Sequence, residues 1–225
     1  MSDLPKRHPE GVFASLEGPE GAGKSSQINR LAERMRAAGR EVVVTREPGG
    51  CKGAEVLRNL VLSGAVQWDP RTELMLFAAA RREHVVRTIA PALARGAVVL
   101  SDRFSESSRA YQGAARGVGT ALCDDLERIA CDGILPDVVF LLDVDPVVGL
   151  ARSKARATDS TMFEALDLEF HRTLRQAFLD RAAERPELFE VIPSMDVAAT
   201  ADAVWAAFLR RFPQALPRDL CAGGR

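Results

Sequence analysis

Apolar positions along the chain follow two alternating patterns. Short, almost continuously apolar runs, such as residues 97–100 and 138–142, are typical of strands buried on both faces. The longer segments between them repeat apolar residues at helical spacing. The expected strands lie near residues 12–17, 41–45, 97–101, 137–143 and 188–192. The expected helices lie near residues 23–38, 50–63, 70–95, 118–132, 145–156, 160–184 and 196–211. This alternation predicts an α/β fold with a parallel sheet covered by helices on both faces.

Polar and charged residues follow the predicted strands. On a parallel sheet, ligands bind beyond the carboxyl ends of the strands. The first strand leads into a glycine-rich loop at 18–25, the second into 45–50, the third into Asp102 and Arg103, and the fourth into Asp143. Any one of these segments alone could be a solvated loop. Because they meet at one edge of the sheet, we expect an active site there.

The loop after the first strand has the complete G-x-x-x-x-G-K-[ST] pattern of a nucleotide-phosphate site. Its glycines allow successive backbone N–H groups to surround a phosphate, and the N-terminus of the next helix attracts negative charge. Lys24 can reach the β- and γ-phosphates, and the Ser25 hydroxyl can bind Mg²⁺. A flexible glycine-rich turn is the alternative, but the strand before and the helix after favour the phosphate site. The predicted ATP-binding residues are Gly18, Pro19, Glu20, Gly21, Ala22, Gly23, Lys24 and Ser25.

The pair Asp102-Arg103 ends a buried strand beside this loop. A carboxylate in that place can hold Mg²⁺ directly or through water, so Ser25 and Asp102 are the predicted metal ligands. The neighbouring arginine can bind a second phosphate with two parallel hydrogen bonds. An aspartate that only caps a helix is the alternative. We therefore expect Lys24, Asp102 and Arg103 to act in catalysis.

Four further motifs give the chain a family resemblance. They are T-R-E-P-G-G at 45–50, F-A-A-A-R at 77–81, D-R-F at 102–104 and A-Y-Q-G at 110–113. Together with the phosphate loop, they make the chain resemble the thymidylate kinases from about residue 11 to about residue 212. The resemblance implies ATP-dependent phosphorylation of dTMP to dTDP by direct in-line transfer, in the service of dTTP synthesis. It also implies a P-loop NTPase fold of three αβα layers, with a five-stranded parallel sheet and a helical lid at about 150–164. Residues 1–10 are expected to be a disordered extension and 213–225 a C-terminal tail.

The resemblance assigns a base pocket. Phe77 would stack on the thymine ring, although a lone Phe at helical spacing is more often part of a core. Arg81 and Ser108 would read the polar edges of the base, and Gln112 would complete the pocket. Pro48 is also expected to contact dTMP.

The resemblance also assigns the sugar and phosphate contacts. Tyr111 would lie where a ribose 2′-hydroxyl would project, and Glu20 would lie near the 3′-hydroxyl. Arg103 would hold the acceptor phosphate, with Arg46 at the same edge. That phosphate is already anionic at neutral pH, so the reaction requires no dedicated general base.

Some thymidylate kinases carry a catalytic arginine in the phosphate loop, and others carry it on the lid. This loop has no arginine, so we expect the lid to supply it. Arg156 is the best match, with Arg152 as a second candidate that also contacts ATP. A solvated helix face is the alternative for both residues. The family usually has an Asp-Arg pair and then acidic residues where this chain has D-S-T-M-F-E at 159–164, which affects the expected closure of the lid.

The composition limits the partners. The net charge is −1, which argues against a nucleic-acid partner, and the longest apolar runs are far shorter than a membrane span. The four cysteines show no C-x-x-C spacing, so we expect reduced thiols in a cytoplasmic protein and no zinc site. The helices at 50–63 and 70–95 are expected to have larger apolar faces than one sheet face can cover. The resemblance adds that members of the family are usually homodimeric, so we expect a homodimer.

Three alternatives remain at the level of sequence. The first is a phosphate-loop kinase for another small acceptor. The second is a nucleotide switch, although the chain lacks the guanine-selecting N-K-x-D pattern. The third is a family member that binds dTMP without efficient turnover, which the unusual lid suggests.

Overall fold

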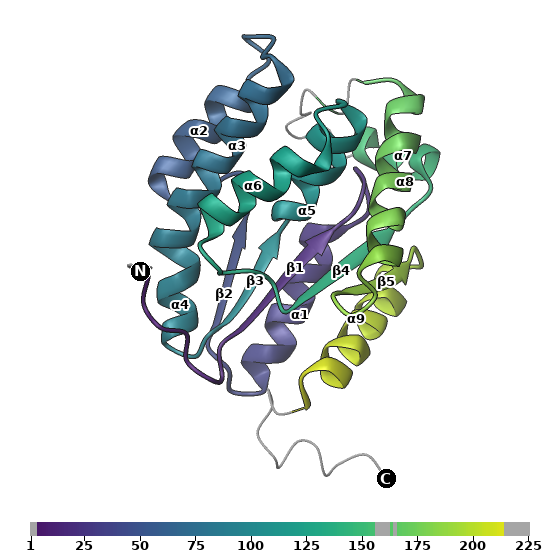
Figure 1. Ribbon diagram of the computed structural model, residues 1–225. Helices are drawn as coiled ribbons and strands as arrows, with labels where there is room; N and C mark the ends of the chain where they lie inside the picture. The colour runs from purple at the N-terminus through teal and green to yellow at the C-terminus, as the bar shows by residue number, and fades with distance from the viewer. Residues whose placement is uncertain (1–3, 156–162, 164–165, 214–225) are drawn as a thin grey trace.

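Five parallel strands form the centre of the molecule, in the order β2-β3-β1-β4-β5 (Figure 1). The computed structural model describes residues 4–155, 163 and 166–213. The strands are β1 (Val12–Glu17), β2 (Val42–Arg46), β3 (Val98–Asp102), β4 (Val138–Asp143) and β5 (Phe189–Pro193). The predicted α/β fold with a five-stranded parallel sheet is confirmed.

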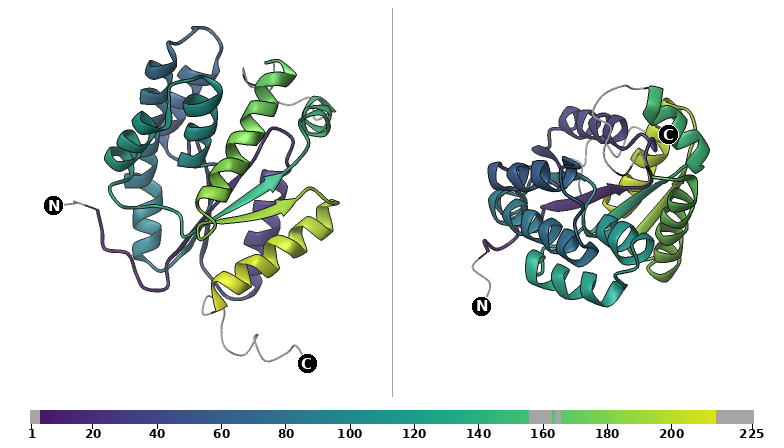
Figure 2. Two further views of the ribbon diagram at one scale, coloured as in Figure 1. Left: turned by 45° about the vertical axis from the view of Figure 1, so that its right-hand side comes forward. Right: turned by 90° about the horizontal axis from the view of Figure 1, so that it is seen from above.

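Helices cover both faces of this sheet, as the view from above shows (Figure 2). One face packs against α1 (Lys24–Ala37) and α9 (Val197–Arg211). The other face packs against a helical segment and a long helix. The segment consists of α3 (Pro70–His84), the π-helical turn η1 (Val85–Ile89) and α4 (Ala90–Ala94), and the long helix is α8 (Leu168–Glu184). The remaining helices are α2 (Lys52–Leu62), α5 (Ser105–Ser108), η2 (Arg109–Ala115), α6 (Thr120–Cys131) and α7 (Pro146–Ala155).

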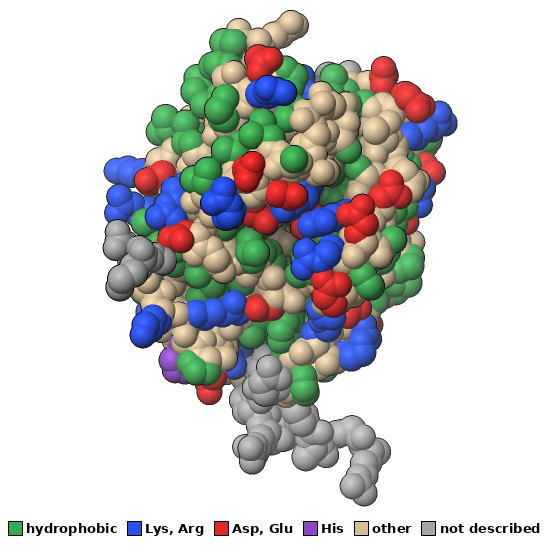
Figure 3. Space-filling view, in the orientation of Figure 1, with side chains coloured by type: hydrophobic (Ala, Val, Ile, Leu, Met, Phe, Trp, Pro, Cys, Tyr) green, Lys and Arg blue, Asp and Glu red, His purple; other side chains and the backbone are tan. Residues whose placement is uncertain are grey.

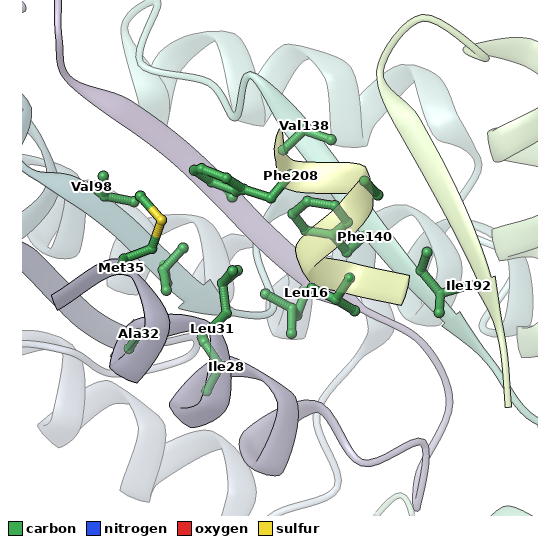
Figure 4. Close-up of a cluster of buried hydrophobic side chains, with 14 of the residues drawn as sticks. Leu16, Ile28, Leu31, Ala32, Met35, Val98, Val138, Phe140, Ile192 and Phe208 are labelled. Carbon is green, nitrogen blue, oxygen red and sulfur yellow. The ribbon is translucent and has the colours of Figure 1, made fainter. Parts of the chain in front are cut away.

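The central strand β1 is buried along its whole length. Leu16 points to the α1 and α9 side, where it packs with Leu31 of α1 and Phe208 of α9 (Figure 4). Phe13 points to the opposite side and meets the ring of Phe104 edge to face, at 5.0 Å between centroids. Because successive side chains of a strand alternate between faces, a strand buried on both sides must be apolar throughout.

The sheet register brings the predicted site residues to one edge. Asp102 at the end of β3 pairs with Leu16 on β1 and with Arg46 on β2. The loop that follows β1 therefore lies beside the carboxyl ends of β2 and β3.

Three helical expectations differ from the structure. The helix expected at 70–95 is helical without interruption from Pro70 to Ala94, but it includes the π-helical turn η1. The helix expected at 160–184 begins at Leu168, where Asp167 accepts a hydrogen bond from the Phe170 backbone N–H, and the described residues 163, 166 and 167 are not helical. The helical turns α5 and η2 between residues 105 and 115 were not expected. Among the described helices, none is long and apolar enough to cross a membrane.

Candidate active site

The loop between β1 and α1 is shaped by close backbone contacts. Gly18, Gly21 and Gly23 all have positive φ, at 138°, 71° and 90°. A Cβ at Gly21 would lie 1.9 Å from the carbonyl oxygen of Gly149 on α7, so the position requires glycine. Among the described residues, no side chain caps the first turn of α1. Backbone N–H groups at the very start of that turn can therefore meet an anionic ligand, whereas those of Ser26 and Gln27 donate to the carbonyl oxygen of Gly23.

Lys24 is buried inside this loop. Its Nζ donates hydrogen bonds to the carbonyl oxygens of Gly18 at 3.0 Å and Pro19 at 2.9 Å. Burial, together with the nearby positive charge of Arg103, lowers the pKa of Lys24 to about 8. The phosphate oxygens of a bound nucleotide would favour the charged ammonium and raise this pKa.

The two predicted metal ligands are hydrogen-bonded to each other. Ser25 Oγ donates to Asp102 Oδ2 at 2.7 Å. Both groups are hard oxygen donors, and Mg²⁺ is typically held by one or two carboxylates while it keeps several waters. The pair therefore fits Mg²⁺. Within the described part of the chain, no group of three or more His, Cys, Asp or Glu side chains forms a fuller metal site.

Arg103 reaches from the end of β3 to the phosphate loop. Its Nη1 donates to the carbonyl oxygen of Gly18 and to Ser107 Oγ, each at 3.1 Å. The residue has a left-handed backbone with φ of 71°. The carboxylate of Glu17 fixes the turn after Arg103, because it accepts hydrogen bonds from the Phe104 backbone N–H at 2.7 Å and from Ser107 Oγ at 2.6 Å. Burial raises the pKa of Glu17 to about 7, although Arg103 acts against this.

The carboxylate of Glu20 lies at the centre of a buried polar cluster. Its Oε1 accepts hydrogen bonds from the Tyr111 hydroxyl and from Arg103 Nη2. Its Oε2 lies 3.4 Å from Nδ1 of His171, and both ring nitrogens of that buried histidine lack a hydrogen-bond partner among the described residues. Burial alone would raise the pKa of Glu20, but contacts with His171, Arg103 and Lys24 lower it to about 2. The group is therefore ionised at neutral pH.

At the other end of the site, Arg81 is fixed by two side chains. Its Nε donates to Glu47 Oε2 at 2.7 Å and its Nη2 to Ser108 Oγ at 3.1 Å. Its guanidinium carbon lies 5.1 Å from the centroid of the Phe104 ring. Glu47 also forms a hydrogen bond with His84 Nδ1 at 3.0 Å, so one buried acid connects Arg81 and His84. No other N–H group of Arg81 donates to a described residue, so these groups can meet an acceptor on a ligand.

One cavity of about 270 Å³ joins these parts. It brings together most of the residues predicted from the sequence, namely Glu20, Gly21, Lys24, Ser25, Arg46, Pro48, Phe77, Arg81, Asp102, Arg103, Ser108, Tyr111 and Gln112. It also includes residues that sequence reasoning missed, among them Glu47, Arg58, Leu62, Ser107 and Phe163. Arg58, the cation in this second group, donates a hydrogen bond to the carbonyl oxygen of Pro48 at 2.7 Å. The predicted Arg46 forms a salt bridge with Glu55 at 3.1 Å.

The lid candidates lie apart from this cavity or outside the described residues. Arg152 is exposed on α7, where its Nη1 donates to Ser194 Oγ at 3.0 Å beyond the end of β5. Arg156 and most of the unusual segment at 159–164 lie outside the described residues. Phe163 is described, and its ring meets that of Tyr111 edge to face at 5.0 Å.

Comparisons with known proteins agree with this geometry. Residues 16–200 match the family described as thymidylate kinase. The chain is 49% identical over 199 residues to a thymidylate kinase of Caulobacter vibrioides, and the match covers 88% of this chain and 94% of that protein. It is 46% identical over 211 residues to one of Geobacter sulfurreducens, with 91% and 99% covered.

A solved structure shares the fold as well. The crystal structure of a thymidylate kinase from Ehrlichia chaffeensis superposes with a TM-score of 0.74 at 34% identity, and the match covers 89% of this chain and 99% of that one. The chain thus matches known relatives over most of its length, and the phosphate loop, Asp102, Arg103 and the cavity lie within the matched part. The chain belongs to the thymidylate kinase family.

Proposed function

We propose that the cavity holds dTMP with its thymine between Phe77 and the polar groups of Arg81, Ser108 and Gln112. The chain phosphorylates dTMP to dTDP with ATP, the reaction of its family. The observation that carries the binding mode is that Lys24 and Ser25 line the same cavity as Phe77, Arg81, Ser108 and Gln112. Pro48 adjoins the same cavity. The product would serve dTTP synthesis.

The sugar and acceptor phosphate would lie between the phosphate loop and the base pocket. Glu20 would accept a hydrogen bond from the 3′-hydroxyl, and Tyr111 would leave no room for a 2′-hydroxyl. Arg103 would bind the acceptor phosphate. The hydrogen bonds of Arg103 to Gly18 and Glu20 hold its guanidinium beside the phosphate loop.

The chemistry is a transfer between two polyanions. The acceptor phosphate is anionic at neutral pH and can attack without a general base. Lys24 and the backbone N–H groups of residues 18–25 would bind the donor phosphates and stabilise the charge of the transition state. Mg²⁺, held by Ser25 and Asp102, would neutralise charge on those phosphates. Arg103 would stay in contact with the acceptor throughout the transfer.

A closing arginine would complete the charge balance. Arg156 is our first candidate and Arg152 our second, because the phosphate loop contains no arginine. Steady-state kinetics of Arg156→Ala test this assignment: we expect a fall in kcat, and an unchanged kcat would remove Arg156 from the mechanism. A low kcat in the wild type as well would favour a protein that binds dTMP without efficient turnover.

A panel of acceptors tests the function as a whole. With ATP as donor, we expect dTMP to give a higher kcat/KM than dUMP, dCMP, dGMP or dAMP. A faster reaction with any of the others would favour a kinase for a different acceptor. Rapid ATP hydrolysis without an acceptor would favour a nucleotide switch.

We also propose a homodimer through α2, α3 and α6. Val56, Met75 and Ile129 are 68%, 49% and 62% exposed on these three helices. Hydrophobic side chains gather over α2 and α3 at the upper left of the space-filling view (Figure 3). Apolar patches of this kind are typical of protein interfaces. A cytoplasmic location and the lack of a nucleic-acid partner stay predictions from the sequence.

A further inference from the structure

A buried carboxylate lies directly behind the proposed base pocket. Glu73, on α3, is completely buried. Its Oε1 accepts a hydrogen bond from Gln112 Nε2 at 2.8 Å, and its Oε2 accepts one from Arg116 Nη2 at 2.9 Å. Burial raises the pKa of Glu73, and the contacts with Gln112 and Arg116 oppose that rise. The guanidinium of Arg116 favours the charged carboxylate.

The charge of Glu73 determines how the amide of Gln112 is turned. An ionised carboxylate only accepts hydrogen bonds, so the amide must present its NH₂ group to Glu73. The amide oxygen then points away from Glu73, and it accepts no hydrogen bond from any described residue. Gln112 is 2% exposed and lines the cavity. Gln112 therefore presents a hydrogen-bond acceptor to the cavity, and Arg81 presents hydrogen-bond donors.

This pair of groups matches one class of pyrimidine. Thymine presents an acceptor at O4 and a donor at N3–H, whereas cytosine presents a donor at its 4-amino group and an acceptor at N3. A site whose buried polar groups are left unpaired by the wrong base rejects that base strongly. An amide turned the other way would place its NH₂ group against N3 and would favour cytosine there.

We propose that Glu73 is a specificity-positioning residue: it holds the Gln112 amide oxygen towards the base and so selects 4-oxo pyrimidine nucleotides over 4-amino ones. Glu73 does not touch the substrate itself and acts through Gln112. The inference rests on the proposed contact between Gln112 and the base.

The test is the ratio of kcat/KM for dTMP to kcat/KM for dCMP. In Glu73→Gln, the new side chain can donate to Gln112 as well as accept from it, so the amide of Gln112 can turn. We expect the ratio to fall at least about tenfold, the effect of one hydrogen bond to a buried group. Arg116→Lys is the matched control, because it alters the other partner of Glu73 but keeps a positive charge beside the carboxylate and leaves the contact with Gln112. We expect it to change the two kcat/KM values by the same factor.

A double-mutant cycle separates this inference from the proposed function. If Gln112→Ala does not lower the ratio, the proposed base contact of Gln112 is wrong. If Gln112→Ala lowers it and Glu73→Gln does not, Gln112 reads the base without Glu73 and the inference is overturned. We expect Glu73→Gln to have no further effect on the ratio in the Gln112→Ala background, since the group through which it acts is then absent.

A measurement on the wild type covers the case in which Glu73→Gln does not fold. The side-chain NH₂ resonances of Gln112 can be assigned by their loss in Gln112→Ala. We expect these protons to be protected from solvent exchange in the free protein, because Glu73 binds them in a buried position. Exchange as rapid as that of an exposed glutamine would overturn the proposal.

Discussion

At the scale of single residues, the charged groups around the phosphate loop are largely buried and hydrogen-bonded to one another or to the backbone. Lys24, Glu20 and Arg103 lie within one hydrogen-bonded group around the phosphate loop. Water is largely excluded from these groups, so each acts more strongly on a bound phosphate than it would on the surface. Their positions are fixed in advance, which limits the reorganisation that the reaction requires.

Lys24→Ala tests the contribution of one such charge. We expect kcat to fall by about a hundredfold to a thousandfold or more, the usual result of removing one preorganised electrostatic group. The Kd for dTMP should change little, because the proposed acceptor contacts are made by other residues. Steady-state kinetics and calorimetric titration with dTMP measure the two effects. The exposed Lys52 provides the control Lys52→Ala, and normal turnover in Lys24→Ala would exclude its role in catalysis.

The sequence predicted the residues whose chemistry is evident in a short motif. Lys24, Ser25 and the Asp102-Arg103 pair belong to that group, and the structure brings them to one cavity. Glu47 and Glu73 were missed, because their contacts with Arg81 and Gln112 join residues 34 and 39 positions apart. No local spacing reports such a contact. The roles of all these residues in binding and catalysis stay predictions.

At the scale of elements, the strands were predicted to within one residue of their observed bounds because each contains a short segment rich in apolar residues. The helical turns at 105–115 were missed for the opposite reason. They are short, and the segment is mostly polar at its start, so it shows no helical repeat of apolar positions. The helix expected at 160–184 differed as well, because α8 begins at Leu168, capped by Asp167, several residues after the expected start.

Glu17 connects two of these elements, β1 and the turn that follows β3, and it should make stability depend on pH. Its pKa is raised to about 7 in the folded protein from a usual value of 4.5. Between these values the folded state binds more protons than the unfolded state. The contribution of Glu17 to the free energy of unfolding therefore falls as pH rises from about 4.5 to about 7, by roughly 3 kcal/mol.

Urea unfolding of the wild type and of Glu17→Gln at several pH values measures this effect. The glutamine does not titrate, so only the wild type should lose this contribution as pH rises through this window. The free energy of unfolding of the variant minus that of the wild type should therefore increase. The difference at pH 4.5 serves as the internal reference for packing changes. A difference that is the same at pH 4.5 and pH 8 would contradict the proposed protonation of Glu17.

The contact between α7 and the phosphate loop provides another test at this scale. A Cβ at Gly149 would lie 2.3 Å from the carbonyl oxygen of Glu20, so Gly149→Ala must push α7 away from the loop. We expect a loss of about 1–3 kcal/mol in stability, as for other overpacked sites. The KM for ATP should rise because the phosphate loop is displaced. Thermal unfolding and steady-state kinetics measure the two effects.

Gly53→Ala is the matched control. Gly53 lies in α2, and the nearest atom to a Cβ added there would be the end of the flexible Glu83 side chain, at 3.1 Å. Alanine should therefore be tolerated there and can raise stability, since it favours helix more than glycine does. If Gly149→Ala behaved like Gly53→Ala, the contact between α7 and the loop would not restrain either element.

At the scale of the whole molecule, the two sides of the sheet have different tasks. The α1 and α9 side is an apolar core centred on β1 (Figure 4). On the other side, α3 packs against both α2 and α6, and its residues Phe77 and Arg81 line the cavity. The proposed dimer contact uses the outer surface of these same three helices. A partner subunit would therefore stabilise the helix that carries the base pocket.

Charged substitutions on that surface test the dimer. We expect the wild type to sediment as a dimer at micromolar concentration and Val56→Glu/Ile129→Glu to sediment as a monomer, because unpaired carboxylates are costly in an apolar interface. The monomer should also show a raised KM for dTMP if the partner holds α3 in place. Val197→Glu is the control, since Val197 is 51% exposed on α9, away from these helices. A monomeric wild type would refute the proposed dimer, and a dimeric double variant would place its interface on another surface.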